Sequence, residues 1–281
     1  MTIDAKVLSD FLQESHDLRG RTAKIAEESV RHNCRKGLAS TATGVSSLFA
    51  AWRLFRTLPP EQPVSERLPD LKNIFVANHV SWLCNTAIGI RSLVIQGLEP
   101  QARVLLRSFL EATHQTLVLF FDTETRKRYY KGWDNESSKN AYFEAFAKKG
   151  RLQKTLQHIE NLASANLTID GQQQLQERIN VLEFYSQATH ASFRHVLLSG
   201  LQPTDGGDFA DTIFGFPSIS SDNTLLNCAH EIAYFSILFD YIVKNVWGFI
   251  EICERDDYKL FMGMASLTAK FRTHQVGSST A

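Results

Sequence analysis

The chain has 281 residues, and its 30 basic side chains balance its 30 acidic ones. Hydrophobic residues make up 43% and charged residues 21%, which is typical of a globular protein and too apolar for a disordered one. The balanced charge argues against a surface that binds nucleic acid or an anionic membrane over its whole extent. The four cysteines show neither a CxxC pair nor a metal-ligand spacing, and the N-terminus lacks the layout of a signal peptide. We therefore expect a cytoplasmic protein without metal or cofactor.

Helical periodicity dominates the chain, and alternating runs typical of strands are nearly absent. Pro100 suits the first turn of a helix, and Ser221-Asp222 has the side-chain chemistry of a helix N-cap. The pattern predicts an all-α fold, a multi-helix bundle with long buried central helices. We expect helices at about 4–36, 40–57, 71–97, 99–121, 123–132, 136–148, 151–165, 171–197 and 222–254, with a shorter one to 272.

Two irregular stretches interrupt the helices. One is rich in proline, and we interpret it as a linker. The other, 199–220, is rich in glycine and longer than most loops of compact domains, which favours a lid or a binding loop. We expect four parts along the chain: an N-terminal helical segment at 1–57, the Pro-rich linker at 58–70, a main helical domain at 71–272 and a flexible tail at 273–281.

The longest apolar run, 232–252, nearly reaches the length that spans a membrane. Asp240, Lys244 and Asn245 lie in its middle, and a charge at the centre of a bilayer costs roughly 2.5–3.5 kcal/mol. Asp240 and Lys244 are also spaced as partners on one helix face. We therefore expect a helix buried in protein and no membrane partner.

The helix expected at 99–121 is apolar on nearly all sides, except for a narrow polar stripe. The stripe stops abruptly, because Val118 and Phe121 occupy the same sector one turn later. Two interpretations are open: the stripe is the solvent-facing edge of the helix, or it lines an internal cleft, where charged groups persist only when they are paired or used. The stripe consists of Arg103, Arg107, Glu111 and His114.

Two other segments carry polar groups that could meet this stripe. One is YSQATHASFRH at 185–195, and the other is the side of the last long helix that holds Asn227, His230, Glu231 and Tyr234. If the three segments face one another, His114, His190 and His230 converge. Each histidine alone is more typical of a structural group. Our candidates are Arg107, Glu111, His114 and His190 for catalysis, and Arg103, Arg194, His230 and Tyr234 for ligand binding.

Charge is distributed unevenly along the chain. The segment RKRYYKGW at 126–133 interleaves basic and aromatic residues, a composition suited to phosphate and base contacts. The stretch 30–60 has five basic residues and no acid, whereas 195–243 has six acids and no Lys or Arg. Solvated helix faces, or attraction between such segments within the protein or across a dimer, also explain this pattern. The candidates for nucleic-acid binding are Arg126, Lys127, Arg128 and Lys131.

The pattern LLRSFLEATHQTLVLFFD, followed later by FYSQATHASFRH, resembles a family of uncharacterised all-helical bacterial proteins over about 70–255. The matching positions are Arg107, Ser108, Glu111 and, more loosely, His190 and Ser192. That family in turn resembles the HEPN group, many of which are dimeric, metal-independent ribonucleases of toxins and phage defence. The HEPN signature is Arg, four to six residues, then His; Arg107 and His114 fit it, as do Arg151 and His158.

The resemblance implies a metal-independent ribonuclease that acts in bacterial stress or phage defence, with RNA as its partner. In this chemistry His114 would move the proton of the RNA 2′-hydroxyl, Arg107 would stabilise the phosphate, and Glu111 would orient either group. Two alternatives stay open: a non-enzymatic helical scaffold or interaction protein, acting as a dimer or with a partner protein, and a helical sensor that binds a small molecule under the 199–220 loop. Glu111 and His114 also form half of a di-metal site, but no second half is found.

Overall fold

The computed structural model describes residues 27–130, 142–165 and 220–273, together with 201–203, 209–211, 218 and isolated positions before 27. The prediction of an all-α multi-helix bundle is confirmed. Two short strands form an antiparallel pair within the stretch that we predicted to be irregular. In chain order the elements are α2 (Arg35–Arg56), α3 (Asn73–Ile95), α4 (Glu99–Phe121), α5 (Thr123–Tyr130), η1 (Phe143–Ala147), η2 (Lys148–Gly150), α7 (Arg151–Ser164), β1 (Leu201–Pro203), β2 (Phe209–Asp211), α10 (Ser221–Tyr241), η4 (Ile242–Val246), α11 (Ile250–Cys253) and α12 (Asp256–Thr273).

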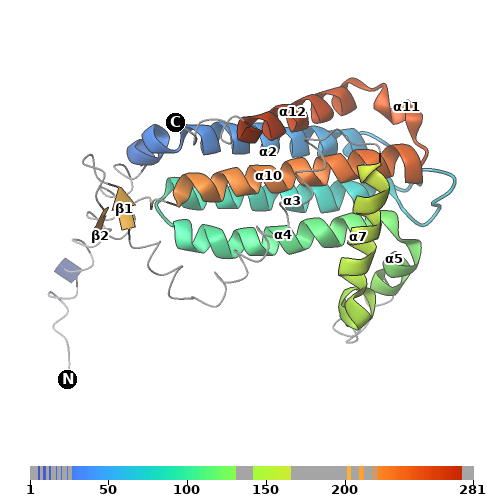
Figure 1. Cartoon of the computed structure of the whole chain (residues 1–281), viewed down its shortest axis with the longest axis horizontal. Helices are drawn as coiled ribbons and strands as arrows, with labels where there is room; N and C mark the ends of the chain where they lie inside the picture. Colours follow the sequence, from blue (N-terminus) through green and yellow to red (C-terminus); the bar gives the residue numbers. More distant parts are fainter. Residues whose placement is uncertain are drawn as a thin grey trace.

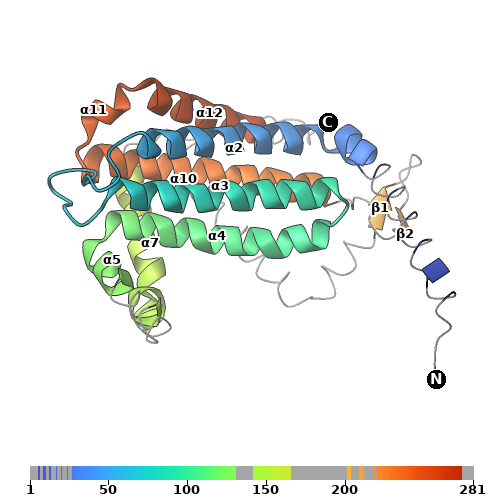
Figure 2. The same ribbon diagram turned by 180° about the vertical axis from the view of Figure 1, so that it is seen from behind.

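The long helices lie side by side in two layers (Figures 1 and 2). Helices α2, α3 and α4 form one layer, and α10 and α12 pack against it. Helices α4 and α10 begin at the same end of the bundle and run parallel, whereas α5 and α7 lie at the opposite end. An aromatic cluster of the core joins these helices, with ring centroids 5.5 to 6.0 Å apart; it contains Phe55, Phe120, Phe239 and Trp247. The long central helices are therefore buried, as the sequence predicts.

Two helix boundaries differ from our predictions. The expected interruption at 37–39 is absent, because the turn lies at Cys34 and α2 runs without a break from Arg35. The single helix expected at 222–254 ends at Tyr241 and is followed by the π-turn η4. Gly248 then adopts the left-handed conformation with φ 63° and turns the chain before α11.

The Pro-rich stretch 58–70 folds into a hydrogen-bonded loop. The Val64 amide donates to the Leu71 carbonyl at 2.8 Å, and Pro63 pairs with Lys72 as an isolated bridge. Val64 and Leu71 are buried in the same hydrophobic core that α2 enters through Phe55. The helix before this stretch and the helices after it thus share one core.

None of the helices within the described ranges combines the length and the apolar character that crossing a bilayer requires.

Helices α2 and α10 approach each other closely through a glycine. A Cβ at Gly37 would lie 2.7 Å from the Leu225 Cβ and 2.9 Å from the Asp222 carbonyl oxygen. The Asp222 carboxylate accepts a hydrogen bond from the Gly37 amide at 2.9 Å. This amide is one of the first four of α2, which have no partner within their own helix. Asp222, which we predicted to cap its own helix, therefore caps α2, and burial raises its pKa.

We predict that Gly37→Ala lowers the free energy of unfolding by about 1–3 kcal/mol, because the new methyl group collides with backbone and with a core side chain. Urea denaturation measures the change. Gly263→Ala on α12 is the matched control, since its Cβ would meet no described atom within 4 Å. Replacing an exposed glycine within a helix by alanine raises the free energy of unfolding by roughly 0.5–1 kcal/mol. Equal stability of the two variants would contradict the close approach.

Candidate functional site

Helices α4 and α10 bury polar side chains against each other along their length. We call this set the α4–α10 seam. Its members are at most 1% exposed, and they fall into two clusters of different character. Ionisable groups withdrawn from water are costly unless they are paired and hydrogen-bonded, which makes such a seam the first place to look for a site. The seam consists of Glu99, Arg103 and His114 on α4 and Thr224, Glu231 and Tyr234 on α10.

The first cluster surrounds Glu99, at the start of α4. Its carboxylate pairs with Arg103 one turn later and accepts hydrogen bonds from Thr224 at 2.5 Å and Ser218 at 3.1 Å. An acidic residue four positions before a basic one is the favourable order on a helix. Sequence analysis missed this cluster, although that spacing of Glu99 and Arg103 was a signal. Arg103, a predicted ligand-binding residue, lies within an internal ion pair.

The second cluster joins His114 to α10. The His114 Nε2 atom lies 3.3 Å from the Glu231 Oε1 atom, without the geometry of a hydrogen bond. The imidazole stands edge-on to the Tyr234 ring at 5.8 Å, and the Tyr234 hydroxyl donates to Glu160 of α7 at 3.0 Å. Neither Glu231 oxygen accepts a hydrogen bond from the described residues. This pair is therefore the least satisfied polar group of the seam.

His230 and two cysteines lie close to residues of the seam. His230, a predicted ligand-binding residue, directly precedes Glu231 and is 5% exposed. Burial, and then the charge of Glu231, raises the pKa of the Cys228 thiol. Burial likewise raises the pKa of Cys34 to about 12, so both thiols stay protonated and are poor nucleophiles. No group of three or more metal-ligating side chains occurs in the part of the chain that the structure describes.

The polar stripe of α4 is divided between the interior and the surface. Arg103 and His114 point into the seam, whereas Arg107 and Glu111 form an ion pair at 2.6 Å with side chains 19% and 50% exposed. One half of the stripe is thus buried, and the other half reaches solvent. Glu111 and His114 do not pair with each other, because Glu111 pairs with Arg107 at the surface and His114 lies against Glu231 in the interior.

The candidates for nucleic-acid binding are also divided. Arg126 is fully buried, and its guanidinium donates to Asp70 at 3.0 and 3.3 Å and to the Leu119 carbonyl at 2.6 Å. Its charge is therefore used inside the protein and is not available to RNA. The Lys127 side chain is 56% exposed and pairs with Glu124 at 3.5 Å. Arg128 is half-buried. The predicted residues Lys131, His190 and Arg194 lie outside the described residues.

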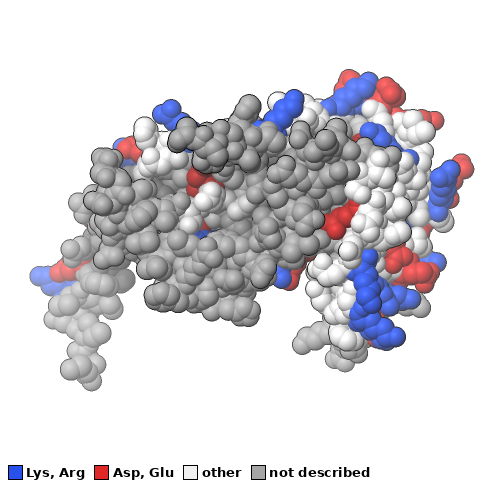
Figure 3. Space-filling view, viewed as in Figure 1, with Lys and Arg blue, Asp and Glu red and all other residues white. Residues whose placement is uncertain are grey.

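Basic groups gather at the end of the molecule that α5 and α7 form (Figure 3). Lys148 donates to the Glu144 carboxylate at 2.7 and 2.9 Å, and Arg151 donates to the Glu144 carbonyl. The hydrogen bond from Lys148, with attraction to Arg151 and Arg128, lowers the pKa of Glu144. Phe143 is 53% exposed beside these groups. The sequence indicated a basic segment here but missed the contribution of Lys148 and Arg151.

Comparison of the chain with models of protein families, with curated proteins and with solved structures finds no match. The function therefore has to be argued from the side chains and their surroundings.

We predict that Asp70→Asn lowers the free energy of unfolding at pH 7 by about 1–3 kcal/mol, because it leaves Arg126 buried without its carboxylate; the partial exposure of Asp70 keeps the loss below that of a fully buried pair. Burial raises the pKa of Asp70, but the hydrogen bond and charge of Arg126 outweigh it and lower the pKa below 3.8. The stabilisation is therefore present above the unfolded-state pKa and is lost as the pH falls through the lower folded-state value.

Denaturation of wild type and Asp70→Asn at pH 7 and at about pH 3 tests this pair, and the difference between them should shrink at the lower pH. Glu124→Gln is the control, because Glu124 pairs with Lys127 at the surface and its loss should change stability by less than about 1 kcal/mol. A difference that persists unchanged in acid would show that the ion pair contributes nothing.

Proposed function

We propose that this chain is a non-enzymatic helical interaction protein, whose buried polar groups align the helices and whose outer helix faces bind a partner. The observation that carries the proposal is the burial of His114, which is 1% exposed. A general acid or base has to reach the proton that it transfers. Arg126, which would have to hold the RNA, is fully buried as well. Groups enclosed in this way support the fold and leave binding to the surface.

The outer faces of α2 and α3 carry large apolar side chains. Phe49 is 50% exposed, Trp82 51% and Ile88 45%. The Phe49 ring also contacts Trp52, with ring centroids 5.2 Å apart. These neighbouring helices lie in front in Figure 2. Exposed aromatic residues are typical anchors of protein interfaces, and a chain with no net charge meets no long-range repulsion from a second copy of itself. We therefore favour self-association through this face.

We predict that the wild-type chain has a mass above its monomer value of 31.8 kDa in light scattering, and that Phe49→Ser with Trp82→Ser returns it to the monomer. Both side chains are half exposed, so the melting temperature of a monomer should change little. Leu162→Ser on α7 is the control, because Leu162 is 38% exposed on a different helix. A wild type that stays monomeric up to about 0.1 mM would contradict self-association, since typical dimers form well below that concentration.

One observation favours a second candidate, the HEPN-like metal-independent ribonuclease that the sequence resemblance implies. His114 lies 3.3 Å from Glu231, and a carboxylate beside an imidazole is the usual arrangement of an acid–base catalyst. Arg107 is partly exposed on the same helix, and the basic end at α5 and α7 would hold the RNA backbone. This function requires the seam to open so that RNA reaches His114.

For this candidate we predict cleavage of single-stranded RNA in the presence of EDTA, with a loss of about 100-fold or more in His114→Ala and in Arg107→Ala. Gel analysis of labelled RNA measures the rate, and thermal melting checks that the variants fold. His158→Ala is the matched control, because Arg151 and His158 repeat the same spacing on α7. If folded His114→Ala still cleaves RNA, His114 takes no part in the reaction. If the wild type cleaves no RNA, the ribonuclease candidate is wrong and the interaction-protein proposal remains.

A further inference from the structure

Basic side chains from three elements gather at the end of the molecule that α5 and α7 form. Between Glu144 and Glu160 the chain has four Lys or Arg residues and no acidic residue. Figure 3 shows Lys and Arg side chains grouped beside α7. We call this surface the basic end; it consists of Arg128 on α5, Lys148 and Lys149 on η2, and Arg151 and Lys154 on α7.

Most of these cations have no carboxylate partner. Lys148 donates to the Glu144 carboxylate at 2.7 and 2.9 Å, and Arg151 donates to the carbonyl of the same residue. The hydrogen bond from Lys148 lowers the pKa of Glu144, and attraction to Arg151 and Arg128 adds to the effect, so these cations surround one carboxylate. Four cations form no ion pair within the described residues: Arg128, Lys149, Arg151 and Lys154.

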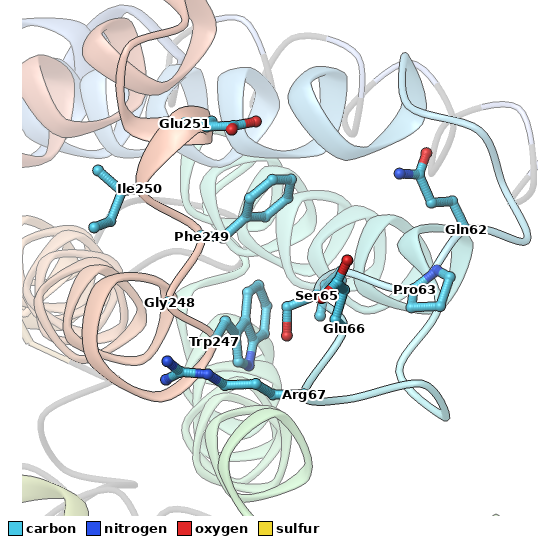
Figure 4. A pocket seen from close by; sticks show the side chains of 11 residues that line it. Gln62, Pro63, Ser65, Glu66, Arg67, Trp247, Gly248, Phe249, Ile250 and Glu251 are labelled. Carbon is cyan, nitrogen blue, oxygen red and sulfur yellow. The ribbon is translucent and has the colours of Figure 1, made fainter.

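A pocket elsewhere on the molecule shows the opposite balance of charge. It has a volume of about 600 Å³ and opens where α10 turns into α11 (Figure 4). Arg67 lies beside Trp247 in this pocket, and Glu66 and Glu251 also line it. These opposite charges offset one another within the pocket. The basic end has no such compensation, so it favours an anionic partner.

Exposed aromatic side chains accompany the cations of the basic end. Phe143 is 53% exposed and Tyr142 is 45% exposed. The Tyr142 hydroxyl accepts a hydrogen bond from Gln115 at 2.8 Å, and its ring packs on Phe146 with the centroids 5.3 Å apart. Tyr142 is therefore held against the bundle, whereas about half of the Phe143 ring remains in water. The basic end thus combines unpaired cations with an apolar group.

The shape and the apolar area of this end indicate which kind of anionic partner it fits. Figures 1 and 2 show α5 and α7 standing out from the long helices. A nucleic-acid strand is usually bound in a groove that follows its backbone. A stable protein interface buries about 800 Å² on each side, more than half of it apolar, whereas two half-exposed aromatic side chains offer roughly 200 Å². A lipid surface is flat, and its headgroup region accepts both cations and aromatic rings.

We propose that the basic end binds the surface of an anionic phospholipid membrane. Lipid phosphate and carboxylate groups pair with the four cations, and the Phe143 ring enters the boundary between headgroups and acyl chains. The contact is peripheral and reversible, because a few cations with one apolar group bind a membrane weakly. The apolar run 232–252, from which we expected no membrane partner, takes no part in it.

Cosedimentation of the full chain with lipid vesicles tests the proposal. We expect binding to phosphatidylcholine vesicles that contain about 30% phosphatidylserine, and binding at least about tenfold weaker to phosphatidylcholine alone. Roughly 1 M NaCl should release the protein, because it shortens the Debye length to about 3 Å. Equal binding to both kinds of vesicle, or no binding to either, overturns the proposal. Binding to single-stranded RNA without binding to the anionic vesicles also overturns it.

Lys149→Asn and Lys154→Gln should each weaken binding to the anionic vesicles about fivefold, which is the contribution of one cation near such a surface. Both side chains are exposed, and asparagine tolerates the left-handed conformation of residue 149, which has φ 57°, so the melting temperature should stay near the wild-type value. Lys259→Gln on α12 is the matched control, because it removes the same charge from a lysine that pairs with Glu254 outside the basic end. Unchanged binding in the combined Lys149→Asn and Lys154→Gln variant contradicts the assignment.

Phe143→Ser leaves every charge in place and should still weaken vesicle binding about fivefold, because the ring no longer enters the lipid boundary. Unchanged binding in this variant contradicts the lipid contact. The outer face of α2 and α3 does not enter these measurements, so failure of membrane binding is distinct from failure of self-association.

Discussion

The carboxylate of Glu99, enclosed within the protein, is the constraint on which the helix arrangement depends. A buried charge costs several kcal/mol unless hydrogen bonds and an opposite charge replace its water. Here Arg103 supplies the charge, and Thr224 and Ser218 supply hydroxyl donors. Because Thr224 lies in the first turn of α10 and Ser218 just before it, sliding α4 along α10 would take both hydroxyl donors away from Glu99. The Asp222 carboxylate, also at the start of α10, accepts a hydrogen bond from the first turn of α2 and so links a third helix to this end of the bundle.

The helical character of the chain could be predicted because it depends on the spacing of apolar residues that are close in sequence. The interruptions could not, since they depend on distant contacts. Nothing near Gly248 in the sequence distinguishes it from a glycine within a helix. Its left-handed conformation, which glycine adopts readily, lies beside Arg67 and next to Trp247, whose indole donates to the Phe120 carbonyl. Arg67 and Phe120 come from segments far away in the chain.

The candidate site could likewise be predicted only in part, because burial depends on contacts between distant segments. The polar stripe of α4 is visible in the sequence, but periodicity alone cannot say which of its members another helix covers. Arg103 and Arg107 are one turn apart, yet the first is 1% exposed and the second has a side chain 19% exposed. Arg126 stands among charged residues in the sequence, as a surface residue would. It is nevertheless buried, because its guanidinium pairs with Asp70, 56 positions earlier. Only charge composition signalled the basic end of the molecule.

The two buried carboxylates of the seam differ in how fully they are hydrogen-bonded and paired. Glu99 is satisfied by an arginine and two hydroxyls, so it needs nothing further. Glu231 has only His114, at 3.3 Å, and neither of its oxygens accepts a hydrogen bond from the described residues. A polar group left in this state lowers stability, whereas an apolar residue of similar size would not. We therefore expect any chemistry within the seam at His114 and Glu231, and we expect the Glu99 cluster to align the helices.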